Sequence, residues 1–252
     1  MLRALRTPLL VTLSALAALA GDLTIIMNAK GKGPMGTGSV GKEVHLYSSK
    51  AYRTNHEGSQ IDSLVNFEEM VTYTINHKKK TIQKLSMEDA LAMMEDAQNQ
   101  MPEGMAGMMN MMFGDPDNFK VEELGADTVA GRACRKYRIT VGKLIWESSN
   151  DASLKPPIPD ASMAKMIKAR GAMMAAAGPS AKVFARLYQE MSKIKGLALK
   201  THMQGFMGID SSSEAESVKE GAIPTSAFAL PTGYALEDMG KKMREQMAKR
   251  RH

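Results

Sequence analysis

The chain has 252 residues, a formal net charge of +6 and an aromatic content of only 5%. A chain of this length can bury the core of one domain or of two small ones. Its only cysteine is Cys134, which excludes an intramolecular disulfide, and no base-stacking motif or DNA-reading helix accompanies the scattered cationic residues, so we expect no nucleic-acid partner.

Residues 1–20 have the three parts of a secretory signal peptide. Arg3 and Arg6 precede an apolar run from Leu9 to Leu19, and Ala18-Leu19-Ala20 forms a cleavage motif. The run is shorter than the about 20 apolar residues that a transmembrane helix needs. No cysteine follows the cleavage motif, so we predict a periplasmic or secreted protein without a lipid anchor. Loss of the two arginines would lower the net charge from +6 to +4.

Alternating apolar and polar residues predict strands through the first part of the mature chain. The first contains Leu23, Ile25 and Met27. Five more are expected at Val40–Ser48, Ala51–His56, Gln60–Phe67, Met70–Asn76 and Lys80–Leu85. Strands spaced by about ten residues favour an antiparallel meander.

The apolar period becomes helical at Ser86, which suits an N-cap. Pro102 should interrupt this helix, and Gly114-Asp115-Pro116 should end the segment. Strands are expected to resume at Phe119–Leu124, Ala133–Val141 and Leu144–Ser148.

A proline-rich linker at residues 155–159 introduces two predicted helices, Ser162–Ala176 and Ser180–Lys195. An alternating strand from Leu197 to Met207 follows, with Ser211–Glu220 as its polar-faced partner. The order of elements predicts an α+β fold in which helices cover one face of a curved antiparallel sheet.

Two glycine motifs resemble phosphate loops. Residues Gly31–Gly36 match G-x-G-x-x-G, and residues Gly36–Lys42 match G-x-x-x-x-G-K without the following Ser or Thr. Neither leads into a helix, which both phosphate sites need, so we interpret the segment as a loop between strands.

Other motifs give no catalytic or metal site. The five histidines include no pair at helical metal-ligand spacing, and no nucleophile elbow is present. Cys134 shares a strand face with Arg132 and Lys136. These cations could stabilise a thiolate, but we favour a packed, inert thiol.

Methionine is the strongest anomaly, because eight of the 23 methionines fall within residues 93–112. This segment contains Met93, Met94, Met101, Met105, Met108, Met109, Met111 and Met112. Three interpretations remain open. The residues can fill a core, or form an adaptable cover that accepts lipid or acyl chains, or bind copper(I) or silver through their sulfurs.

The candidate ligand-binding residues are Met94, Met101, Met105, Met108, Met109 and Met112. The metal alternative uses Met105, Met108, Met109 and Met112. Residues 235–252 predict a separate basic amphipathic helix, which could contact an anionic membrane surface or simply dock by one face.

Three segments carry a resemblance to a known family: Asn76–Thr81, Val129–Tyr137 and Leu230–Tyr234. With the export signal, they resemble an uncharacterised family of exported bacterial proteins of unknown function. That family is similar in plan to the outer-membrane lipoprotein carriers, whose fold is an open antiparallel half-barrel with a helical lid over an apolar cavity. The resemblance covers most of residues 22–236 and implies one half-barrel domain over residues 21–234. It implies no catalytic residue.

Together, pattern and resemblance predict an exported, non-enzymatic protein without a cofactor. Its expected ligand or partner is apolar, a lipid or a lipoprotein acyl chain held under the methionine-rich cover. The alternatives are a methionine-based copper or silver protein of the envelope and an interaction module without a small ligand. The first predicts an apolar cavity beneath residues 86–112, the second predicts converging sulfurs, and the third predicts a filled core with an exposed apolar patch.

Overall fold

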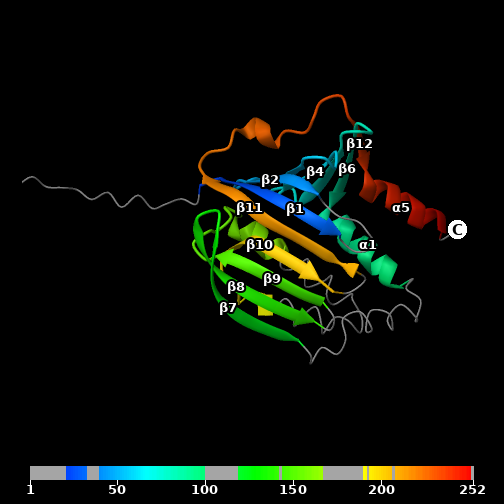
Figure 1. The fold of residues 1–252 in the computed structure, drawn as a ribbon. Coiled ribbons are helices and arrows are strands. Elements are labelled where there is room, and N and C mark those ends of the chain that lie inside the picture. The colour runs from blue at the N-terminus through cyan, green and yellow to red at the C-terminus, as the bar shows by residue number, and fades with distance from the viewer. Residues whose placement is uncertain are drawn as a thin grey trace, which may run out of the picture.

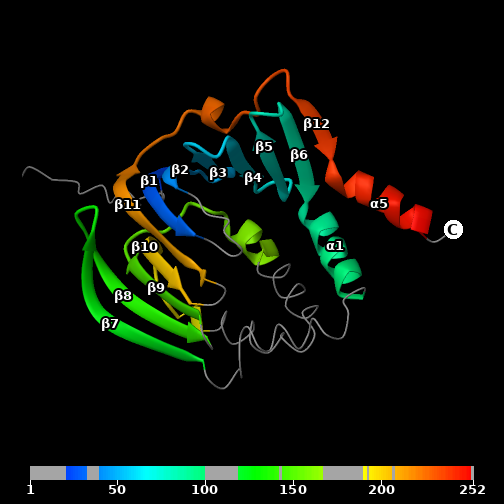
Figure 2. The same cartoon turned by 45° about the vertical axis from the view of Figure 1, so that its right-hand side comes forward.

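The computed structural model describes residues 21–32, 40–99, 119–141, 144–166, 190–191, 193–205 and 208–250. These residues form one twelve-stranded sheet with few helices (Figure 1). The sheet is open and bends strongly along its length (Figure 2). The predicted signal peptide and most of the methionine-rich segment lie outside the described residues.

The first six strands form the predicted antiparallel meander, in which each strand pairs with the next. They are β1 (Leu23–Lys32), β2 (Gly41–Tyr47), β3 (Ala51–His56), β4 (Ile61–Asn66), β5 (Val71–Asn76) and β6 (Thr81–Ser86). Their bounds lie close to the predicted ones, and the alternation is clearest in β1, where every second residue from Leu23 to Ala29 is buried.

The remaining antiparallel strands are β7 (Lys120–Val129), β8 (Arg132–Val141), β9 (Leu144–Asp151), β10 (Leu197–Gln204) and β11 (Asp210–Glu220). β7 is longer than predicted, because Gly125 does not end it. The register of β7 on β8 shifts between Glu123 and Gly125, where the glycine has φ +109°. This bulge allows a strand to continue past a glycine that the sequence pattern treats as a breaker.

The order along the sheet is β12-β6-β5-β4-β3-β2-β1-β11-β10-β9-β8-β7. β11 therefore lies between β1 and β10 and joins the two halves of the sheet. Gly31, predicted to lie in a loop, belongs to β1, and a Cβ atom there would collide with the backbone of Asp210 in β11. Close approach of two strands explains the glycine better than a phosphate loop does.

Helix α1 (Met87–Asn99) directly follows β6, and Ser86 is its N-cap as predicted: the amide of Asp89 donates to Ser86 Oγ over 3.0 Å. The C-terminal helix α5 (Met239–Arg250) begins later than predicted. Residues Ala235–Asp238 form β12 instead, which pairs in parallel with β6. The unpaired edge of β6 accounts for this difference, since it supplies backbone partners that an isolated helix end lacks.

Helices α1 and α5 lie at the β6 end of the sheet, where Arg244 pairs with Asp89 (Figure 2). A further helix covers residues 160–166. Within the described part of the chain, these helices do not clearly cover the sheet. The helical cover of the sheet therefore stays a prediction.

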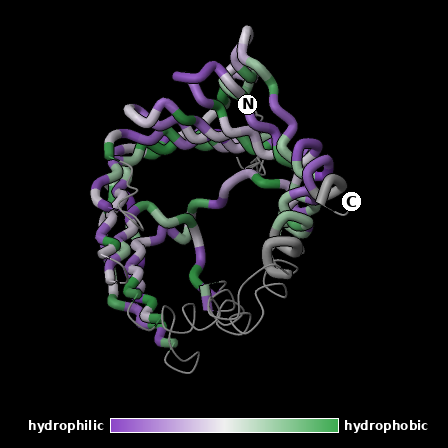
Figure 3. The backbone as a smooth tube through the Cα atoms, turned by 90° about the vertical axis from the view of Figure 1, so that its right-hand side faces the viewer, coloured by the Kyte–Doolittle hydropathy of each residue, from purple (hydrophilic) through white to green (hydrophobic). Residues whose placement is uncertain are grey.

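One face of β1 contributes to the main apolar core. Leu23, Ile25 and Met27 are buried on this face and cluster with Leu199 and Ala215 from β10 and β11. The intervening residues of β1 face the other side of the sheet, because successive strand residues point to opposite faces. A second cluster packs under the 3-10 helix η5 (Thr225–Phe228) and the chain that follows it. Figure 3 shows how the sheet bends round its interior.

Candidate functional site

Of the six predicted ligand-binding methionines, Met94 lies in α1, and nothing is described of its side chain. The other five, Met101, Met105, Met108, Met109 and Met112, lie outside the described residues. The apolar-cover and soft-metal interpretations of this segment therefore stay predictions.

The principal pocket of the described residues is polar and crosses five strands, from β1 to β8. It has a volume of about 590 Å³. Its lining residues are Asn28, Lys30, Lys136, Glu147, Ser148, Ser149, Lys200, Thr201, His202, Ser212, Ser213, Glu214 and Ala215. Only Ala215 is apolar, so the pocket does not have the character of an acyl-chain site.

Strand register assembles this pocket in two rows of cross-strand neighbours. In the first row, Asn28 lies opposite Glu214, Glu214 opposite Lys200, and Lys200 opposite Ser149, which in turn lies opposite Lys136. The second row comprises Lys30, Ser212, His202, Glu147 and Arg138. Neighbours in such rows are close enough for side chains to interact directly.

Ion pairs fix most of the charged groups of the pocket. Lys200 Nζ lies 3.0 Å from Glu214, and Lys136 Nζ lies 2.8 Å from Glu147. Arg138 also pairs with Glu147. Hydrogen bonds, first from Lys136 and then from Arg138, lower the pKa of Glu147, although burial opposes the shift. The hydrogen bond with Glu214 is the largest influence raising the pKa of Lys200. Glu147 and Lys200 are therefore charged at neutral pH.

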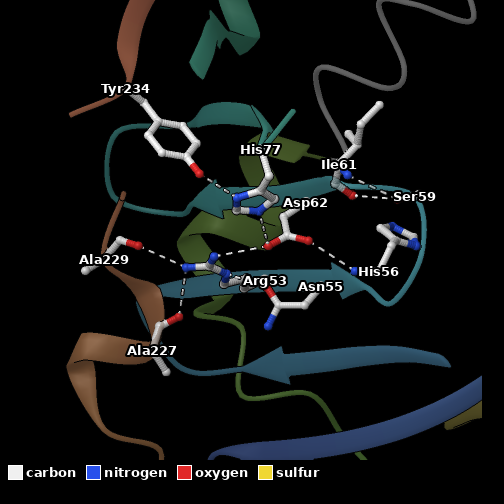
Figure 4. A network of polar contacts seen from close by, with 10 residues as sticks. All are labelled: Arg53, Asn55, His56, Ser59, Ile61, Asp62, His77, Ala227, Ala229 and Tyr234. Atoms are coloured by element: carbon white, nitrogen blue, oxygen red, sulfur yellow. Dashed lines mark hydrogen bonds and ion pairs between the residues drawn. The ribbon is translucent and has the colours of Figure 1, made fainter. Parts of the chain in front are cut away.

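A buried polar network holds the chain between η5 and β12 against the sheet (Figure 4). Arg53 Nη1 donates to the carbonyls of Ala227 and Ala229 over 3.1 and 2.9 Å, while Nη2 lies 3.3 Å from Asp62 Oδ2. His77 Nε2 lies 2.9 Å from the same carboxylate oxygen. Its Nδ1 lies 3.0 Å from the hydroxyl of Tyr234.

We call the network of Arg53, Asp62, His77 and Tyr234 the clasp, and we interpret it as structural rather than catalytic. A carboxylate only accepts hydrogen bonds, so the Nε2 of His77 carries the proton toward Asp62, and in the neutral ring Nδ1 accepts from Tyr234. The other carboxylate oxygen of Asp62 accepts from the amide of His56. Both ring nitrogens and both carboxylate oxygens are thus occupied by the protein itself.

A cluster of titratable side chains on β2 and β3 was not predicted from the spacing of residues in the sequence. Glu43 contacts His45 Nε2 and His56 Nδ1, each over 3.2 Å, and the hydroxyl of Tyr52 lies 2.7 Å from His45 Nδ1. The register that places Glu43 opposite His56 brings the two histidines together. Even so, no group of three His, Cys, Asp or Glu side chains within the described ranges has an arrangement that could hold a metal ion.

Cys134 is a packed thiol. It is 5% exposed and clusters with Leu23, Val129 and Leu199. Burial is the largest influence and raises the pKa of the thiol, and nearby Asp151 raises it further. Burial and the pairing of Arg132 with Asp151 favour the packed, inert thiol over a cation-stabilised thiolate.

These features define an open, mostly antiparallel sheet protein with a polar pocket and a clasp. Residues 45–234 match the family described as Domain of unknown function (DUF4412), and the chain belongs to this family. The predicted resemblance to a family of unknown function is thereby confirmed. No curated protein matches the chain.

Several solved structures are similar to this chain at low sequence identity. An uncharacterised conserved protein from Thermus thermophilus has 6% identity and a TM-score of 0.44, with 87% of this chain and 91% of that chain covered. A chain of the Pseudomonas aeruginosa MucA/MucB complex has 10% identity and a TM-score of 0.40, with 84% and 56% covered. A LolA superfamily protein from Nitrosomonas europaea has 9% identity and a TM-score of 0.31, with 84% and 91% covered.

In the part of the chain that the structure describes, no helix has both the length and the apolar character needed to cross a membrane.

Proposed function

We propose that this protein is an exported, non-catalytic binding protein that holds an apolar ligand, a lipid or a lipoprotein acyl chain, against one face of its curved sheet. The face in question is the one formed by Leu23, Ile25 and Met27 with Leu199 and Ala215. Apolar side chains continue toward the far end of the sheet, where Ile139 and Val141 are buried.

The observation that carries this proposal is the connection between the two ends of the sheet. The chain leaves β6 through α1 at one end of the strand order and returns as β7, the strand at the opposite end. Residues 101–112, which contain six of the eight clustered methionines, belong to this connection. A connection that must join opposite ends of an open sheet is suitably placed to serve as an adaptable apolar cover.

A second connection supports the same arrangement. The chain between β9 and β10 includes residues 152–166, which reach the turn between β4 and β5 in the other half of the sheet. There the buried hydroxyl of Ser162 donates to the carbonyl of Phe67 over 3.1 Å. Figure 2 shows the yellow-green helix of this segment between β9 and α1.

Native mass spectrometry tests the proposal on protein purified from the envelope fraction of its own host. We expect an intact mass that corresponds to cleavage after residue 20, together with co-purifying lipid masses. If the protein carries no lipid mass even under the mildest ionisation conditions, the apolar-ligand proposal is contradicted and an interaction module is favoured instead.

A matched variant separates lipid from metal binding. In the variant M105L/M108L/M109L/M112L, leucine keeps the apolar bulk but removes the sulfur ligands. We expect this variant to retain lipid as the wild type does. Copper(I) bound by the wild type under reducing conditions and lost from the variant would support the methionine-based metal site instead.

A further inference from the structure

The polar pocket lies on the face of β1 opposite the apolar core. Asn28 and Lys30 line the pocket, whereas Met27 and Ala29, which alternate with them, are buried. Successive strand residues point to opposite faces, so Asn28 and Lys30 point away from the face assigned to the apolar ligand. Ala215 is the lining residue that also belongs to the apolar cluster. What the pocket binds through Asn28 and Lys30 is therefore independent of the proposed function.

The size and lining of the pocket fit a small polar molecule. Its volume of about 590 Å³ lies within the roughly 300–1,000 Å³ of small-molecule sites. Two hydroxyl side chains and one amide lie on the face of the pocket that carries Lys30 and Lys200: Ser149, Ser212 and Asn28. Hydroxyl groups both donate and accept, which suits a ligand that is itself rich in hydroxyl groups.

The charges of the pocket leave one cation available for a ligand. Lys136 and Lys200 are neutralised by Glu147 and Glu214 inside the pocket. Lys30 is exposed and has no ion-pair partner among the residues that the structure describes. With histidine neutral, three lysines and two glutamates leave the lining with one net positive charge.

The position of Lys30 shows where an anionic group would bind. Lys30 lies opposite Ser212 on β11, and Ser212 lies opposite His202 on β10. An ammonium and a neighbouring hydroxyl can both donate to one phosphate or carboxylate group. The oxygens of Glu147 and Glu214 can accept from ligand hydroxyl groups farther along the pocket. They would repel a ligand carrying several negative charges throughout its length.

We propose that this pocket binds a small anionic polyhydroxy compound, a sugar-sized molecule with one phosphate or carboxylate group, whose anionic group contacts Lys30 and Ser212. The hydroxyl groups of the ligand bind among Asn28, Lys200 and Glu214.

Isothermal titration calorimetry on the mature protein tests this site with four probes: glucose 6-phosphate, glucuronate, glucose and inorganic phosphate. We expect at least one of the two anionic sugars to bind more tightly than glucose or phosphate. Comparison of the two anionic sugars identifies the preferred anionic group. If neither anionic sugar binds at millimolar concentration, or if phosphate alone binds as well as both, the proposal is wrong.

The variants K30E and K219E provide a matched pair. Both reverse the charge of an exposed lysine on β1 or β11, but Lys219 lies outside the pocket. We expect K30E to weaken binding at least about tenfold, as loss of a charge-assisted contact should, and K219E to leave it nearly unchanged. Equal weakening by the two variants would show a general charge effect and overturn the proposal. Lipid retention by K30E should be unaffected, which distinguishes this test from that of the apolar ligand.

Discussion

The imidazole of His77 and the hydroxyl of Tyr234 meet over 3.0 Å although 157 positions separate them in the sequence. This contact joins the turn after β5 to the segment that leads into β12. The rings also meet edge to face, with centroids 5.7 Å apart. Two of the segments that carry the family resemblance are therefore parts of one clasp.

Replacement of Tyr234 with phenylalanine should destabilise the protein by about 1 kcal/mol, because it removes one intramolecular hydrogen bond but keeps the ring. Urea unfolding followed by circular dichroism measures this change. Y137F is the control, since the phenol of Tyr137 makes no hydrogen bond within the described ranges. Equal stability of Y234F and wild type would show that the contact with His77 contributes nothing to the clasp.

Asp62 should contribute more than Tyr234. Its side chain is 10% exposed and pairs with Arg53, whose side chain is 12% exposed. D62A leaves this guanidinium buried without its carboxylate and should cost about 3 kcal/mol of unfolding free energy.

The exposed residue Asp210 supplies the comparison for Asp62, since its side chain is 77% exposed. D210A should change the free energy of unfolding by less than about 0.5 kcal/mol. If D62A were as stable as D210A, the clasp would not depend on its central carboxylate.

Local alternation predicted most of the sheet but not its long-range pairing. Ala51–His56 forms a strand with the predicted bounds. The period of two that burial of one face imposes is clearest in β1, where alternate residues from Leu23 to Ala29 are buried. Nothing in that period shows that β11 pairs with β1, or that Ala235–Asp238 joins β6. Both pairings depend on a neighbouring strand whose backbone hydrogen-bonding groups are still unpaired. Which strand offers such an edge is a property of the assembled sheet and not of the local sequence.

The polar pocket was not predicted either, because it also depends on which strands pair with one another. Lys30, Lys136 and Lys200 come from three strands far apart in sequence, and only the register brings them to one surface. Each of them, taken alone, looks like a solvated strand lysine. The three consecutive serines of β11, at positions 211 to 213, were a usable signal, but only in combination with knowledge of its two neighbours.

Glu147 should make the stability of the protein depend on acid pH. Because the folded-state pKa of Glu147 is lowered by Lys136 and Arg138, its contribution is present above the unfolded pKa and is lost as the pH falls through the folded value. The E147Q variant should therefore be less stable than wild type at neutral pH. This difference should shrink below the ordinary glutamate pKa of about 4.3.

Urea unfolding of both proteins at a series of pH values from neutral to about 3 measures this dependence. E68Q is the control, because Glu68 is exposed and forms no ion pair in the described part of the chain. A wild-type to E147Q difference that stayed constant down to the lowest pH would exclude a charge-dependent contribution from Glu147.

Cys134 should react slowly with thiol reagents in the native protein. Its burial raises the pKa of the thiol and blocks access, and both effects reduce attack by the thiolate. With Ellman's reagent at mildly alkaline pH, we expect the native protein to react at least about tenfold more slowly than protein unfolded in urea.

A neighbouring cysteine provides the comparison for Cys134. Ala133 is exposed on the same strand, so the double variant A133C/C134S presents a thiol one residue away on the accessible face. This variant should react nearly as fast when folded as when unfolded. If Cys134 in the native protein reacted as quickly as the introduced cysteine, the packing of β8 against Leu23 and Leu199 would have to open readily. The interpretation of Cys134 as a packed, inert thiol would then be wrong.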